Sequence, residues 1–272
     1  MASINKIGKS TVPRTAICTS DEHTIVVRGR DLSKELIGKV SFTDHFFLLL
    51  AGRMPTAGEA AVLNATLVAI AEHGLVPSVQ AARMTFAAAP DAMQGAVAAG
   101  ILGCGSVVLG SSETAGRMYS EIEARTQSGT SLATAALDVM REWRAAGKSI
   151  PGYGHPLHKE RDERVGALFE VARAAGTDLR FVAIAEAAEA AIPELLKKEL
   201  KLNVSGAIPA VLLGAGFPVQ ALKGVPILAR TAGLIAHLYE EIGNPIGFAL
   251  SYQATREMEY EGVVPAGFGK HA

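Results

Sequence analysis

Apolar residues recur along most of the chain with the period of an amphipathic helix. The longest stretches predict helices over residues 59–72, 92–109, 113–123, 131–146, 162–175, 181–200, 208–215 and 227–241. Two shorter helices are predicted over 32–39 and 44–51, with candidate N-caps at Asp31 and Thr43. Thr56, followed three residues later by Glu59, has the form of a capping box. The pattern therefore predicts an all-α fold.

Two segments interrupt the helical pattern. Residues 14–30 contain short apolar runs on both sides of Ser20-Asp21-Glu22, which predicts a small N-terminal β-hairpin. Residues 149–156 read Ser-Ile-Pro-Gly-Tyr-Gly-His-Pro, and a helix cannot continue through these glycines and prolines. We expect this second segment to be a rigid loop between two helices, where functional side chains are often placed.

One stretch has the length of a membrane span. No charged residue occurs between Asp91 and Glu113, which leaves 21 uncharged positions. The stretch contains five glycines, and neither an aromatic belt nor a basic flank frames it. A buried helix whose small residues let another backbone approach closely is the better interpretation. We therefore expect no membrane partner and place this helix at a subunit interface.

Charge and composition narrow the function classes. Lys plus Arg is 26 against 27 Asp plus Glu, a net charge of −1 that gives no sign of a nucleic-acid partner. A glycine-rich phosphate motif is absent, and no His/Cys cluster has metal-ligand spacing, so we expect no bound metal or redox cofactor. Cys18 and Cys104 predict buried, reduced thiols. Because the first residues lack the apolar core of a signal peptide, we expect a cytoplasmic protein.

The segment from Gly152 to Arg164 gathers cations and imidazoles at a loop-to-helix junction. A helix N-terminus adds backbone N–H donors and a positive dipole end, so the segment predicts binding of an anionic ligand. The alternative is that its cations pair with neighbouring carboxylates on a solvated face. The segment alone leaves both interpretations open.

This segment resembles one in the citrate synthase superfamily. Gly152-Tyr153-Gly154-His155, followed nine residues later by Arg164, is similar to the family's Gly-Phe/Tyr-Gly-His and Asp-Pro-Arg. Two further blocks agree in order and spacing across residues 30–245: Ala-Glu-His73 resembles the family's Ala-Asp-His, and Ala-Arg230-Thr-Ala-Gly-Leu-Ile-Ala-His resembles Gly-Arg-Thr-x-Gly-x-Ile-x-His. The short chain and its Gly-His-Pro-Leu-His-Lys block look more like small citryl-CoA lyases, including the corresponding module of ATP-citrate lyase.

The resemblance implies a 2-oxo-acid site at His73, His155, Arg164 and Arg230. In the family the two histidines contact the oxo acid, one donating to its carbonyl oxygen, and the arginines hold its carboxylates. Imidazole donors stabilise charge that develops on a carbonyl oxygen, and guanidinium groups bind carboxylates bidentately. The loop residues Gly152, Tyr153 and Gly154, with Lys159, are expected to contact coenzyme A. His237, two turns from Arg230, is expected in core packing or a supporting hydrogen bond.

Three positions depart from the family pattern. Ser205 stands where the family has an aspartate that moves a proton at the acetyl methyl group, and serine is a poor general base near neutral pH. Leu109 occupies the place of the imidazole that polarises the thioester. Asn244-Pro-Ile replaces Arg-Pro-Arg, so one carboxylate clamp is missing. We keep Ser205 as a catalytic position, with Glu113 and Asp91 as weak candidates for the missing carboxylate.

Three functions remain open from the sequence. The first is a citryl-CoA lyase-like enzyme that cleaves, or forms, the bond between acetyl-CoA and oxaloacetate or a related 2-oxo acid. The second is a citrate synthase that condenses the same substrates, and the third is a homologue that binds a 2-oxo acid without turnover. In each enzyme the coenzyme A thioester is a substrate, and no cofactor stays bound.

The resemblance also implies an architecture. A large helical domain is expected from residues 1–159 and 239–272, and a small helical domain from residues 160–238. The site would lie between them, and closure of the small domain would exclude water. A homodimer or a dimer of dimers is expected.

Overall fold

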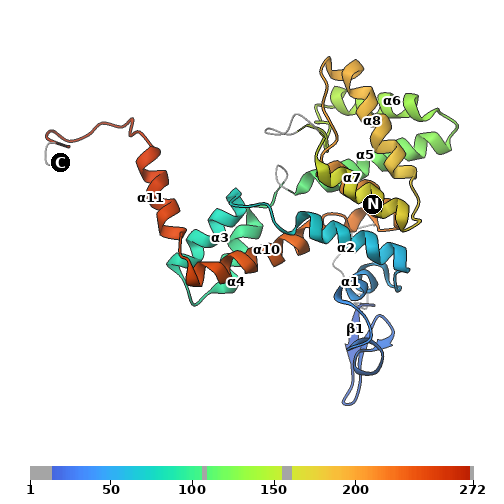
Figure 1. The fold of residues 1–272 in the computed structure, drawn as a ribbon, viewed down its shortest axis with the longest axis horizontal. Helices are drawn as coiled ribbons and strands as arrows, with labels where there is room; N and C mark the ends of the chain where they lie inside the picture. Colours follow the sequence, from blue (N-terminus) through green and yellow to red (C-terminus); the bar gives the residue numbers. More distant parts are fainter. Residues whose placement is uncertain (1–13, 106–108, 155–160, 270–272) are drawn as a thin grey trace, which may run out of the picture.

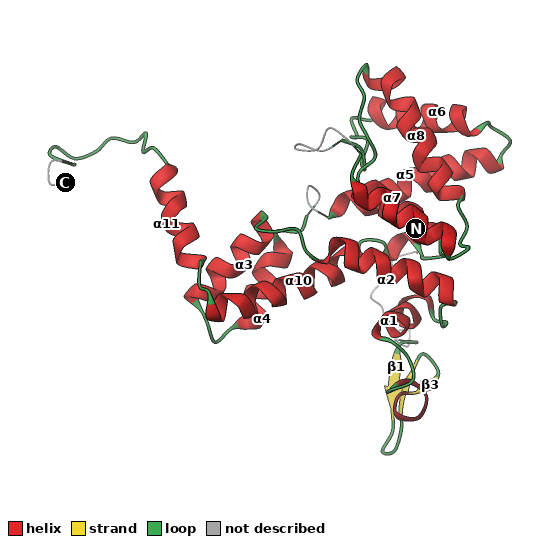
Figure 2. Cartoon of the chain, in the orientation of Figure 1, coloured by secondary structure: helices red, strands yellow, loops and turns green. Residues whose placement is uncertain are grey.

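The computed structural model describes residues 14–105, 109–154 and 161–269. Within these ranges the chain is helical apart from one small antiparallel sheet (Figure 2). The sheet consists of β1 (Cys18–Ser20), β2 (Ile25–Val27) and β3 (Arg30–Asp31), and short helical turns occur at η1 (Leu32–Leu36) and η2 (Val219–Ala221). The helices are α1 (Phe42–Ala51), α2 (Ala57–Ala71), α3 (Pro77–Ala88), α4 (Met93–Leu102), α5 (Gly110–Gln127), α6 (Leu132–Ala145), α7 (Glu163–Ala174), α8 (Arg180–Leu196), α9 (Val204–Gly214), α10 (Gly224–Gly243) and α11 (Gly247–Glu257). The predicted all-α class with a small N-terminal β element is confirmed.

The helices form two groups, and α2 and α10 lie between them (Figure 1). In one group α5, α6, α8 and α9 pack together, and α7 contacts both α9 and α2. In the other, the α3–α4 hairpin packs on α10, and α11 packs on α3. The small sheet extends beyond α1, while the segment after α11 runs away from the body (Figure 1). The long helix α10 therefore links the two groups.

Two hydrophobic clusters hold these groups. The larger contains buried residues from α1, α2 and α5 to α10, and its members on α10 are Val225 and Ala229. The smaller joins α3 and α4 to the second half of α10 through Val79, Phe86, Leu234 and Leu238. Since α10 contributes to both clusters, its position is fixed from both sides.

The local signals at the N-terminal end were mostly correct. The hairpin pairs Cys18 with Val27, as the apolar runs predicted, and β3 adds a strand that the sequence did not predict. Thr56 and Glu59 form the predicted capping box at the start of α2. The predicted cap at Thr43 is wrong: Ser41 caps α1 and forms a capping box with Asp44.

The uncharged stretch does not form one helix. α4 ends at Leu102 and α5 begins at Gly110, so the predicted helix over 92–109 is interrupted. The close approach of α3 explains why position 100 is a glycine, because a Cβ there would lie 2.8 Å from the backbone oxygen of Ser78. Gly100 thus serves the packing of α4 on α3 within this chain. Among the described residues, no helix is both long and apolar enough to cross a bilayer.

The two cysteines differ in exposure. Cys104 is buried, as the apolar run predicted, and its thiol donates to the carbonyl of Gly100. Cys18 is exposed, contrary to the prediction, because β1 is an edge strand of a sheet that projects from the body.

The helix packing bears on the predicted division into domains. α5 and α6 precede residue 160, yet they pack against α8 and α9. The larger hydrophobic cluster continues across this position. The contacts thus group α5 and α6 with helices of the predicted small domain, and the boundary itself stays a prediction.

Candidate functional site

The loop Gly152–Gly154 is held against the segment that leads into α9. Gly154 donates its N–H to the carbonyl of Lys201 at 2.7 Å, and Asn203 donates its N–H to the carbonyl of Gly152 at 3.0 Å. The side-chain amide of Asn203 donates to the carbonyl of Gly154 at 2.7 Å. A Cβ on Gly152, whose φ is +87°, would lie 2.6 Å from the Cα of Gly206, so only glycine fits there. These contacts hold the described part of the loop in a tight conformation, as the glycines and prolines predicted.

Tyr153 is part of the protein interior. Its hydroxyl lies 2.9 Å from that of Tyr119 and donates to the carbonyl of Ala185 at 2.9 Å. Burial raises the pKa of both phenols well above the usual value, so both stay neutral. These contacts, with those of Gly152 and Gly154, anchor the loop and leave the Tyr153 side chain no free polar group for coenzyme A. His155 and Lys159, the other predicted ligand contacts of this segment, lie outside the described residues.

Ser205 lies in the first turn of α9. Asn203 caps this helix and accepts hydrogen bonds from the N–H groups of Ser205 at 2.9 Å and Gly206 at 3.3 Å. The Ser205 side chain is half-buried. The same asparagine therefore places both Ser205 and the loop that leads to His155.

Arg164 lies in the first turn of α7 and is paired with Asp162. Its Nε and Nη2 donate to the two carboxylate oxygens at 3.0 and 2.7 Å. Burial raises the pKa of Asp162, but hydrogen bonds from Arg164 outweigh it, and the backbone N–H of Val204 acts in the same direction. The pKa of Asp162 therefore lies below its ordinary value. A third donor, Nη1, reaches the carbonyl of Ala69 on α2 at 3.4 Å.

Arg230 is a buried cation on α10. The residue is 3% exposed, and its Nε and Nη1 have no hydrogen-bond partner among the described residues. Leaving a guanidinium unpaired in the interior is costly, so an anionic ligand is the natural partner. The geometry thus points to a carboxylate site at this place.

One face of α10 is pressed against the end of α2. A Cβ on Gly233 would lie 2.1 Å from the carbonyl oxygen of Ala71. Arg230 and His237 lie about one turn on either side of Gly233 and so share its face of the helix. His73 follows α2 on the next exposed turn.

The structure places the described candidates around the C-terminal end of α2. Arg164 reaches Ala69, α10 meets Ala71 beside Arg230, and His73 follows directly. Ser205 lies on α9, which packs against α7, the helix that carries Arg164. The backbone N–H of its neighbour Val204 also contacts Asp162, the partner of Arg164. The described residues thus bring the three sequence blocks to one region.

The two candidates for the missing carboxylate differ. Glu113 lies in the first turn of α5, a helix that packs on α9, and it forms an ion pair with Arg117 at 2.7 Å. Asp91 lies exposed in the turn between α3 and α4, on the hairpin that packs against α10. Only Glu113 belongs to an element beside Ser205.

Leu109 has a left-handed backbone. It is buried, has a φ of +70° and precedes α5, where it makes no side-chain cap. Such a conformation is strained for a branched side chain and often marks a functional position. Leu109 is also the position at which the family pattern has a histidine.

Two carboxylates support the candidates: the pairing of Arg164 with Asp162 is one that the sequence had left open, whereas the role of Glu72 was missed. Asp162 orients Arg164, and Glu72 accepts hydrogen bonds from the backbone of His73 and Gly74. Each carboxylate lies within two residues of the candidate it supports, and that proximity was the available signal. Within the described ranges, no group of His, Cys, Asp and Glu could hold a metal ion.

Comparison with known proteins gives a consistent result. The family model "Citrate synthase, C-terminal domain" matches residues 41–246. Citrate synthase of Haloferax volcanii is 26% identical, covering 72% of this chain and 50% of its own length. Citrate/2-methylcitrate synthase of Bacillus subtilis is 29% identical, covering 75% of this chain and 54% of its own. The chain therefore spans about half the length of the curated relatives it matches.

Solved structures agree over nearly the whole chain. Citryl-CoA lyase from Hydrogenobacter thermophilus is 33% identical with a TM-score of 0.81, and the alignment covers 96% of this chain and 98% of that one. ATP citrate lyase from Methanothrix soehngenii, solved in complex with citrate and coenzyme A, is 23% identical with a TM-score of 0.74 over 96% of this chain and 43% of its own, which shows a shared fold. With the family model matching most of its length, the chain belongs to the citrate synthase family.

Proposed function

We propose that this chain is a citryl-CoA lyase-like enzyme. It would cleave, or form, the carbon–carbon bond between the acetyl group of acetyl-CoA and oxaloacetate or a related 2-oxo acid. The observation that carries the proposal is Arg230, a buried guanidinium group with two nitrogens unpaired among the described residues. The similarity to a citryl-CoA lyase over nearly the full length of both chains supports the same assignment.

In this proposal Arg230 and Arg164 hold carboxylates of the oxo acid. His73 and His155 donate to its carbonyl oxygen and stabilise the negative charge that develops there. Arg164 has its Nε and Nη2 paired with Asp162, so a ligand carboxylate would bind at its remaining N–H groups. Asp162 then acts by fixing the orientation of the guanidinium plane.

The acyl half of the site is expected to work differently from that of a citrate synthase. Ser205 would stand beside the acetyl group, and Glu113 is the nearer candidate for a carboxylate because α5 packs on α9. At 244–246 the chain has no arginine. Instead, the carbonyl of Asn244 accepts from Arg83 at 3.0 Å, and Ile246 donates to Glu241 at 2.9 Å. A ligand with one fewer carboxylate, such as pyruvate, would suit this loss of a clamp.

Two alternatives follow from the same positions. Condensation of acetyl-CoA with the oxo acid is the reverse of the cleavage and would use the same groups. A citrate synthase would then also hydrolyse the resulting thioester with water, which releases coenzyme A. A homologue that binds the oxo acid without turnover is favoured by Leu109 and Ser205, which replace both acyl-group residues of the family. The oxo-acid half of the proposal is common to all three.

We further propose that the protein acts as a homodimer or a dimer of dimers in the cytoplasm. Large apolar side chains are exposed along the second half of α10 and on α11, including Tyr239, Ile242, Phe248 and Tyr252. Exposed apolar side chains in such numbers are typical of an interaction surface. The predicted small domain, with α5 and α6 packed on it, would close over the bound substrates.

The test measures coenzyme A chemistry in both directions. Purified protein is assayed for release of coenzyme A from acetyl-CoA with oxaloacetate or with pyruvate, and for cleavage of citryl-CoA to acetyl-CoA. We expect citryl-CoA cleavage by the wild type and its loss in Arg230→Ala, with Arg173→Ala, an exposed arginine on α7, as the control. Binding of an oxo acid without turnover in either direction would favour the binding homologue. Absence of both binding and turnover would refute the proposed site.

A further inference from the structure

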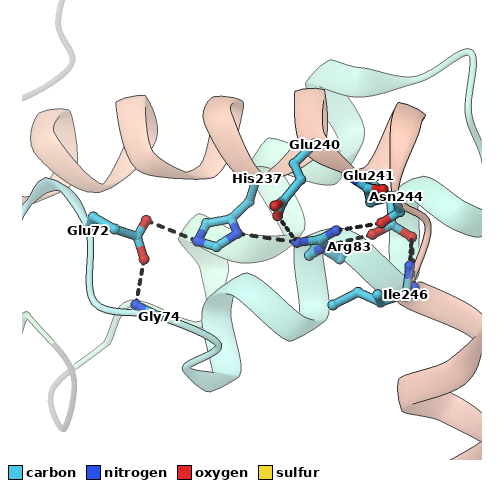
Figure 3. A network of polar contacts seen from close by, with 9 residues as sticks. Glu72, Gly74, Arg83, His237, Glu240, Glu241, Asn244 and Ile246 are labelled. Atoms are coloured by element: carbon cyan, nitrogen blue, oxygen red, sulfur yellow. Dashed lines mark hydrogen bonds and ion pairs between the residues drawn. The ribbon is translucent and has the colours of Figure 1, made fainter.

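A chain of polar contacts leads from the turn that carries His73 to the start of α11 (Figure 3). It begins at Glu72, whose Oε1 accepts the N–H of His73 at 2.8 Å and that of Gly74. Gly74 has a φ of +71°, so the backbone reverses there. One carboxylate oxygen thus fixes the backbone from which the His73 side chain departs.

The other oxygen of Glu72 faces His237 on α10. Oε2 lies 2.9 Å from Nε2 of His237, and Nδ1 of the same ring lies 3.4 Å from Nη1 of Arg83 (Figure 3). An arginine can only donate, so Nδ1 must accept, and the proton of the ring then lies on Nε2, the nitrogen that faces the Glu72 carboxylate. Burial raises the pKa of Glu72, but its hydrogen bonds outweigh this effect and hold that pKa below its ordinary value. The His237 ring therefore lies between the Glu72 carboxylate and the Arg83 guanidinium group, with Nε2 facing the first and Nδ1 the second.

Arg83 continues the chain through α3 and is itself buried, at 2% exposed. Its Nε donates to Glu241 at 2.5 Å and its Nη1 to Glu240 at 2.6 Å. The second oxygen of Glu241 accepts the N–H groups of Ile246 at 2.9 Å and Gly247 at 2.7 Å, where α11 begins. A buried guanidinium with two carboxylates is geometrically demanding, so Arg83 has little freedom to move.

We propose that Glu72, His237 and Arg83 are positioning residues that fix the direction of the His73 imidazole toward the substrate carbonyl. The inference rests on the proposed function, since it assigns these residues a part in that site. None of the three is placed against the substrate. They act by holding the Glu72 carboxylate, which accepts from the His73 backbone, through polar contacts that join the end of α2 to α10 and α3.

The geometry predicts which kinetic constant responds. The carboxylates of the oxo acid are held by Arg164 and Arg230, so loss of the His73 orientation should leave KM nearly unchanged. A carbonyl donor displaced by about 1 Å lowers turnover by about 10- to 100-fold. We expect that fall in kcat for Glu72→Gln and for His237→Leu, and no larger fall in the double variant, because both changes break the same contact. His237→Gln retains an N–H donor toward Glu72 and should recover most of the turnover.

Glu59→Gln is the matched control. Glu59 lies at the other end of α2, where it also accepts a backbone N–H, from Thr56 at 2.7 Å, and pairs with an arginine, Arg53. This substitution should lower the thermal midpoint of unfolding and leave kcat unchanged. A normal kcat in folded His237→Leu, or falls in kcat that multiply in the double variant, would overturn the proposal.

A second readout does not depend on turnover. Amide hydrogen exchange at His73 and Gly74 should be at least about tenfold faster in His237→Leu than in the wild type, and unchanged in Glu59→Gln, because the Glu72 carboxylate loses its support. If the wild type shows no turnover, the proposed function fails. The contact between His237 and Glu72 is then tested by the exchange rate alone. Unchanged exchange in His237→Leu would refute it.

Discussion

Arg164 and Arg230 differ in what surrounds each guanidinium group. Arg164 is paired with Asp162, whereas the Nε and Nη1 of Arg230 are buried without a partner in the described part of the chain. A buried unpaired charge destabilises the folded state, while a satisfied pair does not. The two arginines should therefore respond differently to replacement.

Replacement of either arginine should weaken binding of the oxo acid by about 2–3 kcal/mol, because a ligand carboxylate is left unpaired. The loss of binding free energy in the double variant should be smaller than the sum of the losses in the two single variants, since both residues hold the same ligand. Arg230→Met should also raise the thermal midpoint of the ligand-free protein, while Arg164→Ala should lower it because Asp162 loses its partner. Calorimetric titration and thermal unfolding measure both effects. A lower midpoint for Arg230→Met would show that its guanidinium has a partner.

Ser205 tests the acyl half of the site. Because it lies in the first turn of α9, an aspartate there would interact favourably with the helix dipole, and Ser205→Asp should fold. If the family chemistry applies, the added carboxylate should raise coenzyme A release from acetyl-CoA and oxaloacetate by about 10²-fold or more. Robust wild-type turnover that falls in Ser205→Asp would mean that serine belongs to a rearranged mechanism.

At the level of elements, the contact between α2 and α10 places the site. Gly233→Ala would bring a Cβ within 2.1 Å of the Ala71 carbonyl, so the two helices must separate. We expect a loss of about 1–3 kcal/mol in unfolding free energy, as in overpacked cores, and weaker binding of the oxo acid. Chemical denaturation and ligand titration measure these changes.

Gly166 supplies the matched control for Gly233. It lies within α7, and a Cβ added there would meet no other atom within 4 Å, so Gly166→Ala should stabilise the protein by up to about 1 kcal/mol. Equal effects of the two substitutions would mean that helix propensity, and not the approach of α2, determines the result at Gly233.

The sequence predicted the helices that have a clear apolar face and missed two that do not. α3 was missed because the buried Arg83 interrupts its apolar face, and its charge is satisfied only by Glu240 and Glu241, far along the chain. α11 was missed because its apolar side chains are exposed in the single chain and mixed with polar ones. Both cases depend on partners that no local pattern contains.

The candidate site divides in the same way. Its residues could be recognised from short motifs, because the motifs keep their order and spacing. The polar contacts between Glu72, His237 and Arg83 could not, since they join three helices through tertiary packing. For His237 the sequence offered only core packing or a supporting hydrogen bond, and the structure has the hydrogen bond.

At the level of the whole molecule, many of the exposed large apolar side chains lie on α10, on α11 and in the segment that follows α11. Phe248 is 69% exposed and Tyr252 is 64% exposed. If a second copy covers them, Tyr252→Glu should shift the protein toward monomer in analytical ultracentrifugation, whereas Leu179→Glu, at the start of α8, should not. A wild-type monomer at micromolar concentration would contradict the proposed assembly.

The unequal exposure of the two thiols gives the molecule a built-in pair of reporters. A maleimide reagent should modify Cys18 at the rate of a free peptide thiol. It should modify Cys104 more slowly, because this buried thiol reacts only after local opening of the structure around it. Cys104 follows α4 and belongs to the larger hydrophobic cluster. The rate at which it is modified would therefore report the rate of local opening in the region between the two helix groups. A bound oxo acid that clamps the groups together would slow the modification of Cys104 while leaving the Cys18 rate unchanged.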